Sequence, residues 1–293
     1  MKKTLALALA LAAALPMAAS AHKQWIIPSQ AVVNGSDVWV TFDAAVSNQL
    51  FFPDHVPMRL DGIRVTAPDG SQVELANGAT GKYRSTFDVQ LAQPGTYRIA
   101  NASAGMSARW DTPESLAAKA RAEAAGTPAT GPGAPPATRG GFLRNATAED
   151  LATKVPADAE NLEVTQTASR VETFVTNGAP NSTALAATGE GIELEPVTHP
   201  NDLFAGEEAS FRVLVDGKPA AGLAFEIVRG GTRYRNAQDD IAATTDAQGL
   251  LRVTWPEAGI YWLETGVEDD KATLPQATAR RLRYVATLEV LPQ

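Results

Sequence analysis

Apolar and polar residues alternate with a period of two in the first third of the chain. Val38, Val40 and Phe42 are separated by Trp39 and Thr41, and Pro-Asp-Gly and Asn-Gly sequences follow. Alternation places successive side chains on opposite faces of a sheet, and Gly, Asn and Asp favour the tight turns between strands. The pattern therefore predicts a β-sandwich in this third.

The last third repeats the pattern. Apolar residues alternate at 211–215 and again at 223–227, on either side of an Asp-Gly-Lys-Pro turn, which is typical of a hairpin. Both thirds also contain a Pro/Gly turn that leads into an aromatic strand, at 93–99 and 256–263. This arrangement resembles the tyrosine corner of immunoglobulin-like sandwiches.

Helix signals are confined to the middle of the chain. Residues 111–114 read Asp-Thr-Pro-Glu, which is a capping start with proline at the first helical position, and residues 115–124 are rich in helix formers. A second short helix is predicted over residues 147–154. Strand-like residues return at about 162–175.

The predicted fold class is therefore all-β, with two immunoglobulin-like β-sandwich domains at residues 22–105 and 193–293. A connecting segment at 106–192 carries the short helices. Within it, residues 126–139 are almost entirely Gly, Pro, Ala and Thr, which are too poor in apolar bulk to be ordered by burial, so we expect a disordered excursion there.

The N-terminus has the pattern of a cleavable signal peptide. Lys2 and Lys3 precede an apolar stretch at 4–15, and Ala19 and Ala21 supply the small residues before the cut. Cleavage after residue 21 would make His22 the first residue of the mature chain. No later apolar run approaches the roughly 20 residues that cross a bilayer, so we expect a periplasmic protein that does not insert into the membrane.

The composition and motifs of the chain argue against several classes of partner and site. The chain has 25 Lys and Arg against 33 Asp and Glu, which argues against nucleic acid as a partner. It has no cysteine, so any metal must be held by nitrogen and oxygen. The sequence contains no phosphate-binding glycine loop, nucleophile elbow or zinc-protease helix, and no organic cofactor or catalytic residue is predicted.

The chain has three histidines, His22, His55 and His199. A terminal His22 offers its α-amino and ring nitrogens to one ion, and His55 and His199 lie in proline-stiffened loops that could add a further imidazole. Such a nitrogen set favours Cu(II), then Ni(II), by the Irving–Williams order. The carboxylates expected to orient the rings are Asp43, Asp54 and Asp202.

Each histidine also has a simpler interpretation. His22 could be a disordered terminus, His55 an exposed loop residue, and His199 a structural residue bonded to the backbone. Three functions stay open at this point: a metal-binding accessory protein, a non-catalytic module that binds protein or glycan, and a copper-dependent oxidase that uses the terminal histidine.

Three stretches carry a resemblance to a known family. They read AHKQWIIP from Ala21, GEGIELEPVTHP from Gly189, and LVDGKP from Leu214 followed by Gly222. In these the chain resembles the exported domain-of-unknown-function family 4198, whose members are labelled as the periplasmic component of cobalt or nickel uptake and often begin with histidine. The resemblance implies a cobalt or nickel protein that serves a membrane uptake system. The Gly-His-Pro segment frequent in the family is replaced here by a Pro-Asp-His-Val-Pro sequence around His55.

Overall fold

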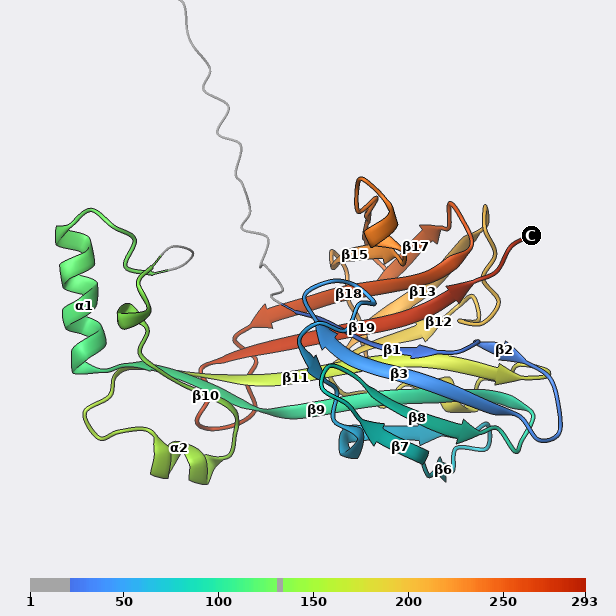
Figure 1. Cartoon of the computed structure of the whole chain (residues 1–293), viewed down its shortest axis with the longest axis horizontal. Helices are drawn as coiled ribbons and strands as arrows, with labels where there is room; N and C mark the ends of the chain where they lie inside the picture. The colour runs from blue at the N-terminus through green and yellow to red at the C-terminus, as the bar shows by residue number, and fades with distance from the viewer. Residues whose placement is uncertain (1–21, 131–133) are drawn as a thin grey trace, which may run out of the picture.

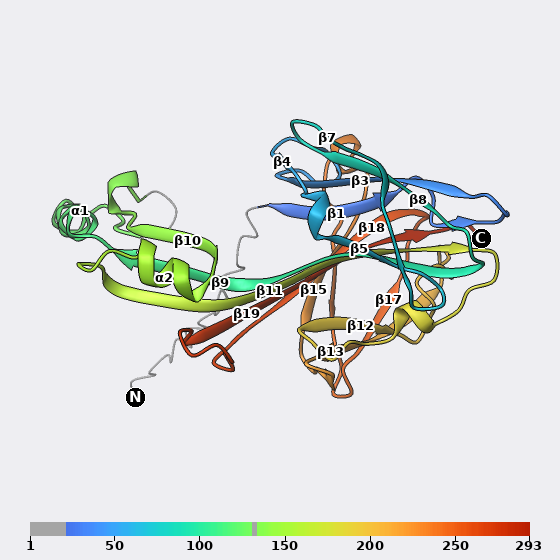
Figure 2. The ribbon, with the colours of Figure 1, turned by 90° about the horizontal axis from the view of Figure 1, so that it is seen from below.

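The computed structural model describes residues 22–130 and 134–293, so the predicted signal peptide lies outside the described residues. About half of the described chain is β-strand, in three stacked sheets (Figures 1 and 2). The prediction of a mostly β fold is confirmed. The arrangement of the sheets differs from two separate sandwiches.

The middle layer is a ten-stranded sheet that both ends of the chain help to build. In spatial order its main path is β16 (Ile241–Thr244), β15 (Ala224–Arg229), β18 (Gly259–Asp269), β19 (Ala279–Val290), β11 (Glu160–Asn177), β9 (Gly95–Asp111), β5 (Ile63–Thr66) and β6 (Gln72–Val73). Two further strands, β10 (Gly141–Ala146) and β2 (Val32–Val33), pair with β9 and β11. β11 runs parallel to β19 and β2, and the other pairs are antiparallel.

A smaller sheet covers each face of this layer. One contains β1 (Lys23–Pro28), β3 (Trp39–Ser47), β8 (Ser85–Gln90), β7 (Ala76–Thr80) and β4 (Val56–Pro57). The other contains β12 (Ile192–Pro196), β13 (Glu208–Val215), β14 (Lys218–Pro219) and β17 (Leu250–Thr254). Short 3-10 turns lie in the loops at η1 (Leu60–Gly62), η3 (Thr183–Leu185) and η4 (Thr232–Tyr234).

The two hydrophobic cores share the middle sheet. On β11, Val171 and Val175 belong to the core under β1 and β3, whereas Phe174 belongs to the core under β12 and β13. On β18, Trp262 enters the first core and Tyr261 the second. Because adjacent side chains of a strand point to opposite faces, a strand that is apolar at both sets of positions is buried on both faces. The predicted boundary after residue 105 falls inside β9.

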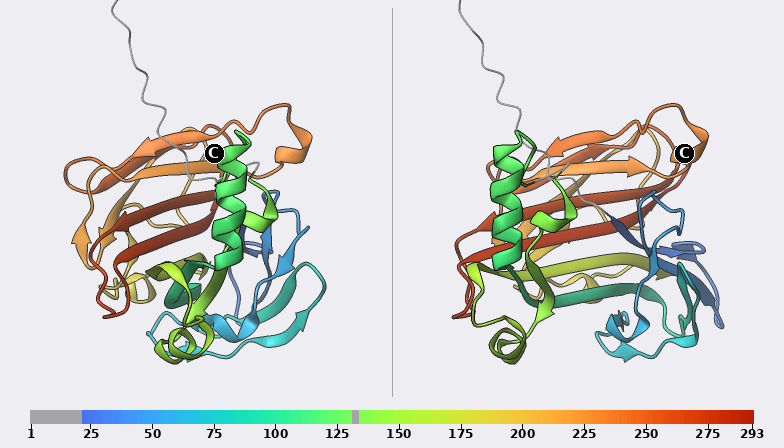
Figure 3. Two further views of the ribbon diagram at one scale, coloured as in Figure 1. Left: turned by 90° about the vertical axis from the view of Figure 1, so that its left-hand side faces the viewer. Right: turned by 60° about the vertical axis from the view of Figure 1, so that its left-hand side comes forward.

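Beyond the outer sheets, β9 and β11 extend to a small tip (Figures 1 and 3). The tip holds β10, α1 (Pro113–Ala124), α2 (Ala148–Lys154) and η2 (Pro136–Thr138) around a third small core that includes Met106 and Trp110. Capping boxes at Thr112 and Thr147 begin the two helices, where the sequence places helix starts. Part of the predicted disordered excursion is ordered, because Thr138 is buried and bonds to the Pro135 carbonyl oxygen. Residues 131–133 lie outside the described residues.

Candidate metal site at the N-terminal histidine

The rings of His22 and His55 are stacked, with centroids 4.0 Å apart and planes at 17°. Their strands explain the meeting. β1 and β4 pair with opposite edges of β3, and Val46 is opposite Gln24 on one side and Val56 on the other. The residues that precede β1 and β4 therefore reach the same end of β3, and their side chains meet across it.

The backbone at His22 is held in place by residues from the C-terminal half. The Lys23 ammonium lies 2.9 Å from Glu226 Oε1 and 4.0 Å from the ring centroid of Trp262. The Trp262 indole N–H donates to the Gln24 carbonyl oxygen at 2.9 Å. Arg283 Nη2 donates to the His22 carbonyl oxygen at 3.1 Å. The backbone is thus held in place from His22 onward.

The loop that carries His55 is fixed by Asp54. Its Oδ1 accepts hydrogen bonds from the hydroxyl of the fully buried Ser47 and, at 2.8 Å, from the backbone N–H of Asn48. The hydrogen bond from Ser47, followed by that from Asn48, lowers the pKa of Asp54. The neighbouring Phe51 packs edge-on against Trp25, with centroids 5.7 Å apart. Asp54 therefore stays ionised beside the histidine pair while it holds the loop.

The surroundings favour a neutral His22 ring. Desolvation is the largest cause that lowers the pKa of His22, followed by the charges of His55 and Arg144; the charge of Asp54 raises it, and that of Arg283 adds a smaller lowering. A neutral imidazole is the form that binds a metal. Sequence reasoning did not find Arg144 or Arg283, because only the pairing of distant strands brings them here.

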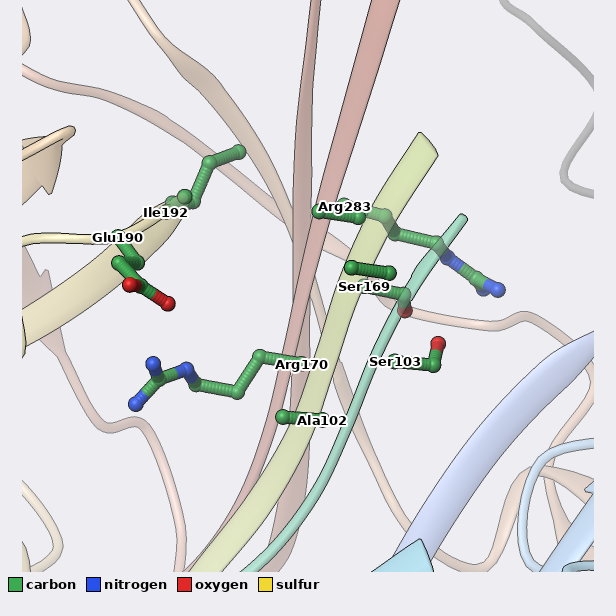
Figure 4. A pocket seen from close by; sticks show the side chains of 10 residues that line it. Ala102, Ser103, Ser169, Arg170, Glu190, Ile192 and Arg283 are labelled. Carbon is green, nitrogen blue, oxygen red and sulfur yellow. The ribbon is translucent and has the colours of Figure 1, made fainter. Parts of the chain in front are cut away.

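The sheet beside the histidine pair carries two serines and an arginine in a row across three strands. Ser103, Ser169 and Arg283 are cross-strand neighbours on β9, β11 and β19. Figure 4 shows these three side chains on one side of the strands, with Arg170 and Glu190 on the other. A hollow of about 150 Å³ adjoins this part of the sheet, with Arg170, Glu190 and Ile192 in its lining.

His199 does not join His22 and His55. Its Nε2 lies 2.9 Å from Thr96 Oγ1, and its Nδ1 accepts from the Asn201 backbone N–H at 3.2 Å. Thr96 is opposite Thr176 on β11, and Arg283, which contacts His22, is opposite Ser169 on the same strand. Thr176 lies seven residues beyond Ser169, so His199 and the histidine pair are separated by on the order of 20 Å. Both ring nitrogens of His199 have protein partners in this place.

The carboxylates predicted to orient the rings have separate roles. Asp43 Oδ1 lies 3.3 Å from Arg84 Nη1, and the charge of Asp202 raises the pKa of His199. Only Asp54 lies beside the pair. Among residues 22–130 and 134–293, no group of three or more His, Cys, Asp and Glu could hold a metal ion. The side-chain donors at this place are therefore two imidazoles, and a third nitrogen must come from elsewhere.

The environment of His199 makes stability depend on pH. Burial is the main cause that lowers its pKa below 6.5, against smaller opposing effects of the Asn181 backbone and Asp202. As the pH falls below 6.5, the unfolded chain binds a proton at His199 before the folded protein does. The stability that the neutral ring contributes is complete above pH 6.5 and is lost as the pH falls toward the lower pKa of the folded protein. We expect acid to destabilise the wild type more than His199→Gln in urea unfolding between about pH 5 and pH 8. Both proteins contain His22, so its titration affects the stability of both equally. Equal pH dependence of stability in the two proteins would contradict the prediction.

Comparison with known proteins gives a family and no function. Solved structures similar to the chain include the D0-D1 domain of intimin, at 10% identity over 90% of this chain and 97% of that chain, with a TM-score of 0.21. They also include the two tandem V-type regions of VCBP3, a v-region-containing chitin binding protein, at 11% identity over 90% and 98%, with a TM-score of 0.19. Scores this low support no inference. No curated protein matches the chain.

Neither described helix has the length and hydropathy needed to span a membrane. The resemblance noted in the three sequence stretches is confirmed, because a family model matches residues 19–269, which is most of the chain. The chain belongs to the DUF4198 family, a domain of unknown function.

Proposed function

We propose that the mature protein, cut before His22, is a periplasmic accessory protein that binds a divalent transition metal. The α-amino nitrogen and the imidazole of His22 would chelate the ion, and the imidazole of His55 would complete a three-nitrogen set. The observation that supports this is the stacked pair of rings, 4.0 Å apart, at the predicted new terminus. Cu(II), then Ni(II), suits such a set, with Co(II) binding more weakly.

The pair must rearrange slightly to bind. Ring nitrogen lone pairs lie in the ring plane, so two stacked rings do not aim at a common point, and rotation about the side-chain torsions must bring both nitrogens to about 2 Å from the ion. The fixed backbone at His22 and the hydrogen-bonded Asp54 keep this adjustment local. The protein would hold the ion and pass it to a membrane uptake system.

The test is calorimetric titration of the processed, metal-free protein with Cu(II) and with Ni(II). Mutating a residue that only hydrogen-bonds to a metal ligand typically lowers metal affinity by about 10- to 100-fold. Removing a ligand itself should weaken binding at least as much, so His55→Ala should lower Cu(II) affinity by about 10- to 100-fold or more. His199→Gln removes a histidine distant from the pair and should leave the affinity unchanged. Equal affinity in wild type and His55→Ala would contradict the proposal.

The titration also separates the alternatives. A protein that binds neither metal would favour a non-catalytic module that recognises protein or glycan. Peroxide consumption by the copper-loaded protein, lost in His55→Ala, would favour a copper-dependent oxidase.

A further inference from the structure

The tip contains a hollow of about 550 Å³ between β9, β10, α1 and η2. This volume is in the range of pockets that enclose small organic ligands. Its lining combines apolar groups, such as Phe142 and Ala134, with four cationic side chains: Arg109, Lys119, Arg139 and Arg144. The one carboxylate in the lining is Asp111.

Most of these cations have no carboxylate within ion-pairing distance in the described residues. Asp111 is used by Lys119, whose ammonium lies 2.5 Å from its Oδ1, and by Asn161, which donates to its Oδ2 at 3.0 Å. Within the part of the chain that the structure describes, neither Arg109, Arg139 nor Arg144 forms an ion pair with an acidic group. Three unpaired guanidinium groups around one hollow are unexpected in a chain with a net charge of −8.

Phe142 keeps two of these groups at the pocket. The guanidinium carbons of Arg109 and Arg144 lie 5.9 Å and 5.4 Å from the centroid of its ring, which is within the range of cation–π contact. The ring is half exposed, at 46%, and is not part of the small core of the tip. An aromatic surface flanked by arginines offers contact to a carbon skeleton and paired N–H donors to carboxylates.

We infer that this pocket binds a small organic anion that carries two or more carboxylates. Separate guanidinium groups fit separate carboxylates, and the apolar lining together with the volume favours an organic skeleton over a bare inorganic anion. The charge of Arg144 also contributes to lowering the pKa of His22. The inference nevertheless rests on the pocket alone and holds whether or not the histidines bind metal.

The probe is citrate, titrated calorimetrically into the metal-free mature protein at low salt. We expect binding that weakens at least tenfold in the double variant Arg109→Gln/Arg144→Gln. Arg212→Gln, which removes an exposed arginine on the outer sheet, should bind as the wild type does. Binding should also weaken as the salt concentration rises.

Three results would overturn the inference: no citrate binding to the wild type at millimolar concentration, equal binding in the double variant, or tighter binding of inorganic phosphate than of citrate. His22→Ala separates this inference from the metal proposal. It removes a metal donor and leaves the arginines intact, so citrate binding should persist in it even if metal binding is lost.

Discussion

Replacing Glu172 with alanine is expected to lower the free energy of unfolding by about 3–5 kcal/mol, because it removes a carboxylate from a buried charged cluster. Glu172 lies on β11 at the centre of the molecule and is 1% exposed. Its Oε1 accepts the Tyr284 hydroxyl at 2.6 Å, and its Oε2 lies 3.8 Å from Arg98 Nε and 3.9 Å from Arg170 Nη1. Without the carboxylate, the mostly buried Arg98 loses its counter-charge. Arg170 keeps a second carboxylate, that of Glu193, whose Oε1 lies 3.4 Å from its Nη1.

The measurement is urea unfolding followed by circular dichroism. Glu195→Ala is the matched control, since it also removes a glutamate that forms an ion pair, here with Arg212 at 3.1 Å. Unlike the cluster at Glu172, both side chains of this pair are over 40% exposed. An exposed pair contributes about 0–1 kcal/mol, so the control should lose little stability. A loss below about 1 kcal/mol for Glu172→Ala would show that the buried cluster does not stabilise the central sheet.

Local signals in the sequence predicted more of the fold than long-range ones. The helix starts at Thr112 and Thr147 depend on hydrogen bonds within three residues, which the sequence displays directly. The division into domains depends on which strands pair. β9 and β11 pair residues as far apart as Gly95 and Asn177, and no local pattern reveals such a partner.

The shared middle sheet was missed for a related reason. Strand-like residues at 162–175 are visible in the sequence, but their alternation does not say that both faces are covered. The structure places Val171 in one core and Phe174 in the other, so a segment that looks like a connector is a central strand. A strand with bulky apolar residues at both odd and even positions is the signal that could have indicated this.

The residues that meet at the candidate site were equally hard to predict from the sequence. The sequence names three histidines, but spacing does not determine which of them meet. The registers of β1 and β4 on β3 bring His22 to His55, while Thr96 and Asn201 keep His199 elsewhere. Arg144 and Arg283 could not be assigned to the site from the sequence, because their positions depend on which strands pair. β10 joins the sheet by pairing with β9, and β19 joins it by pairing with β11, which is more than a hundred residues away in the sequence.

Adding one alanine before His22 is expected to lower Cu(II) affinity by on the order of 100-fold, equivalent to about 2.7 kcal/mol of binding free energy. In the processed protein the amine and the ring of His22 belong to the same residue and can close a chelate ring on one ion. The extra residue converts that amine into a peptide nitrogen, which must lose a proton before it can bind a metal, and moves the free amine away from His55. The anchors at Lys23, Gln24 and the His22 carbonyl oxygen should leave the fold intact.

Calorimetric titration of both proteins with Cu(II), in a buffer that contains a weak competing ligand, measures the difference. Mass spectrometry of each sample establishes which residue comes first. Adding an alanine after Gln293 is the matched control, because it lengthens the chain equally at the other end and should leave the affinity unchanged. If the N-terminal extension binds Cu(II) as tightly as the processed protein, the α-amino nitrogen is not a ligand, and the remaining pair of imidazoles would have to bind the ion without the chelate that favours copper and nickel.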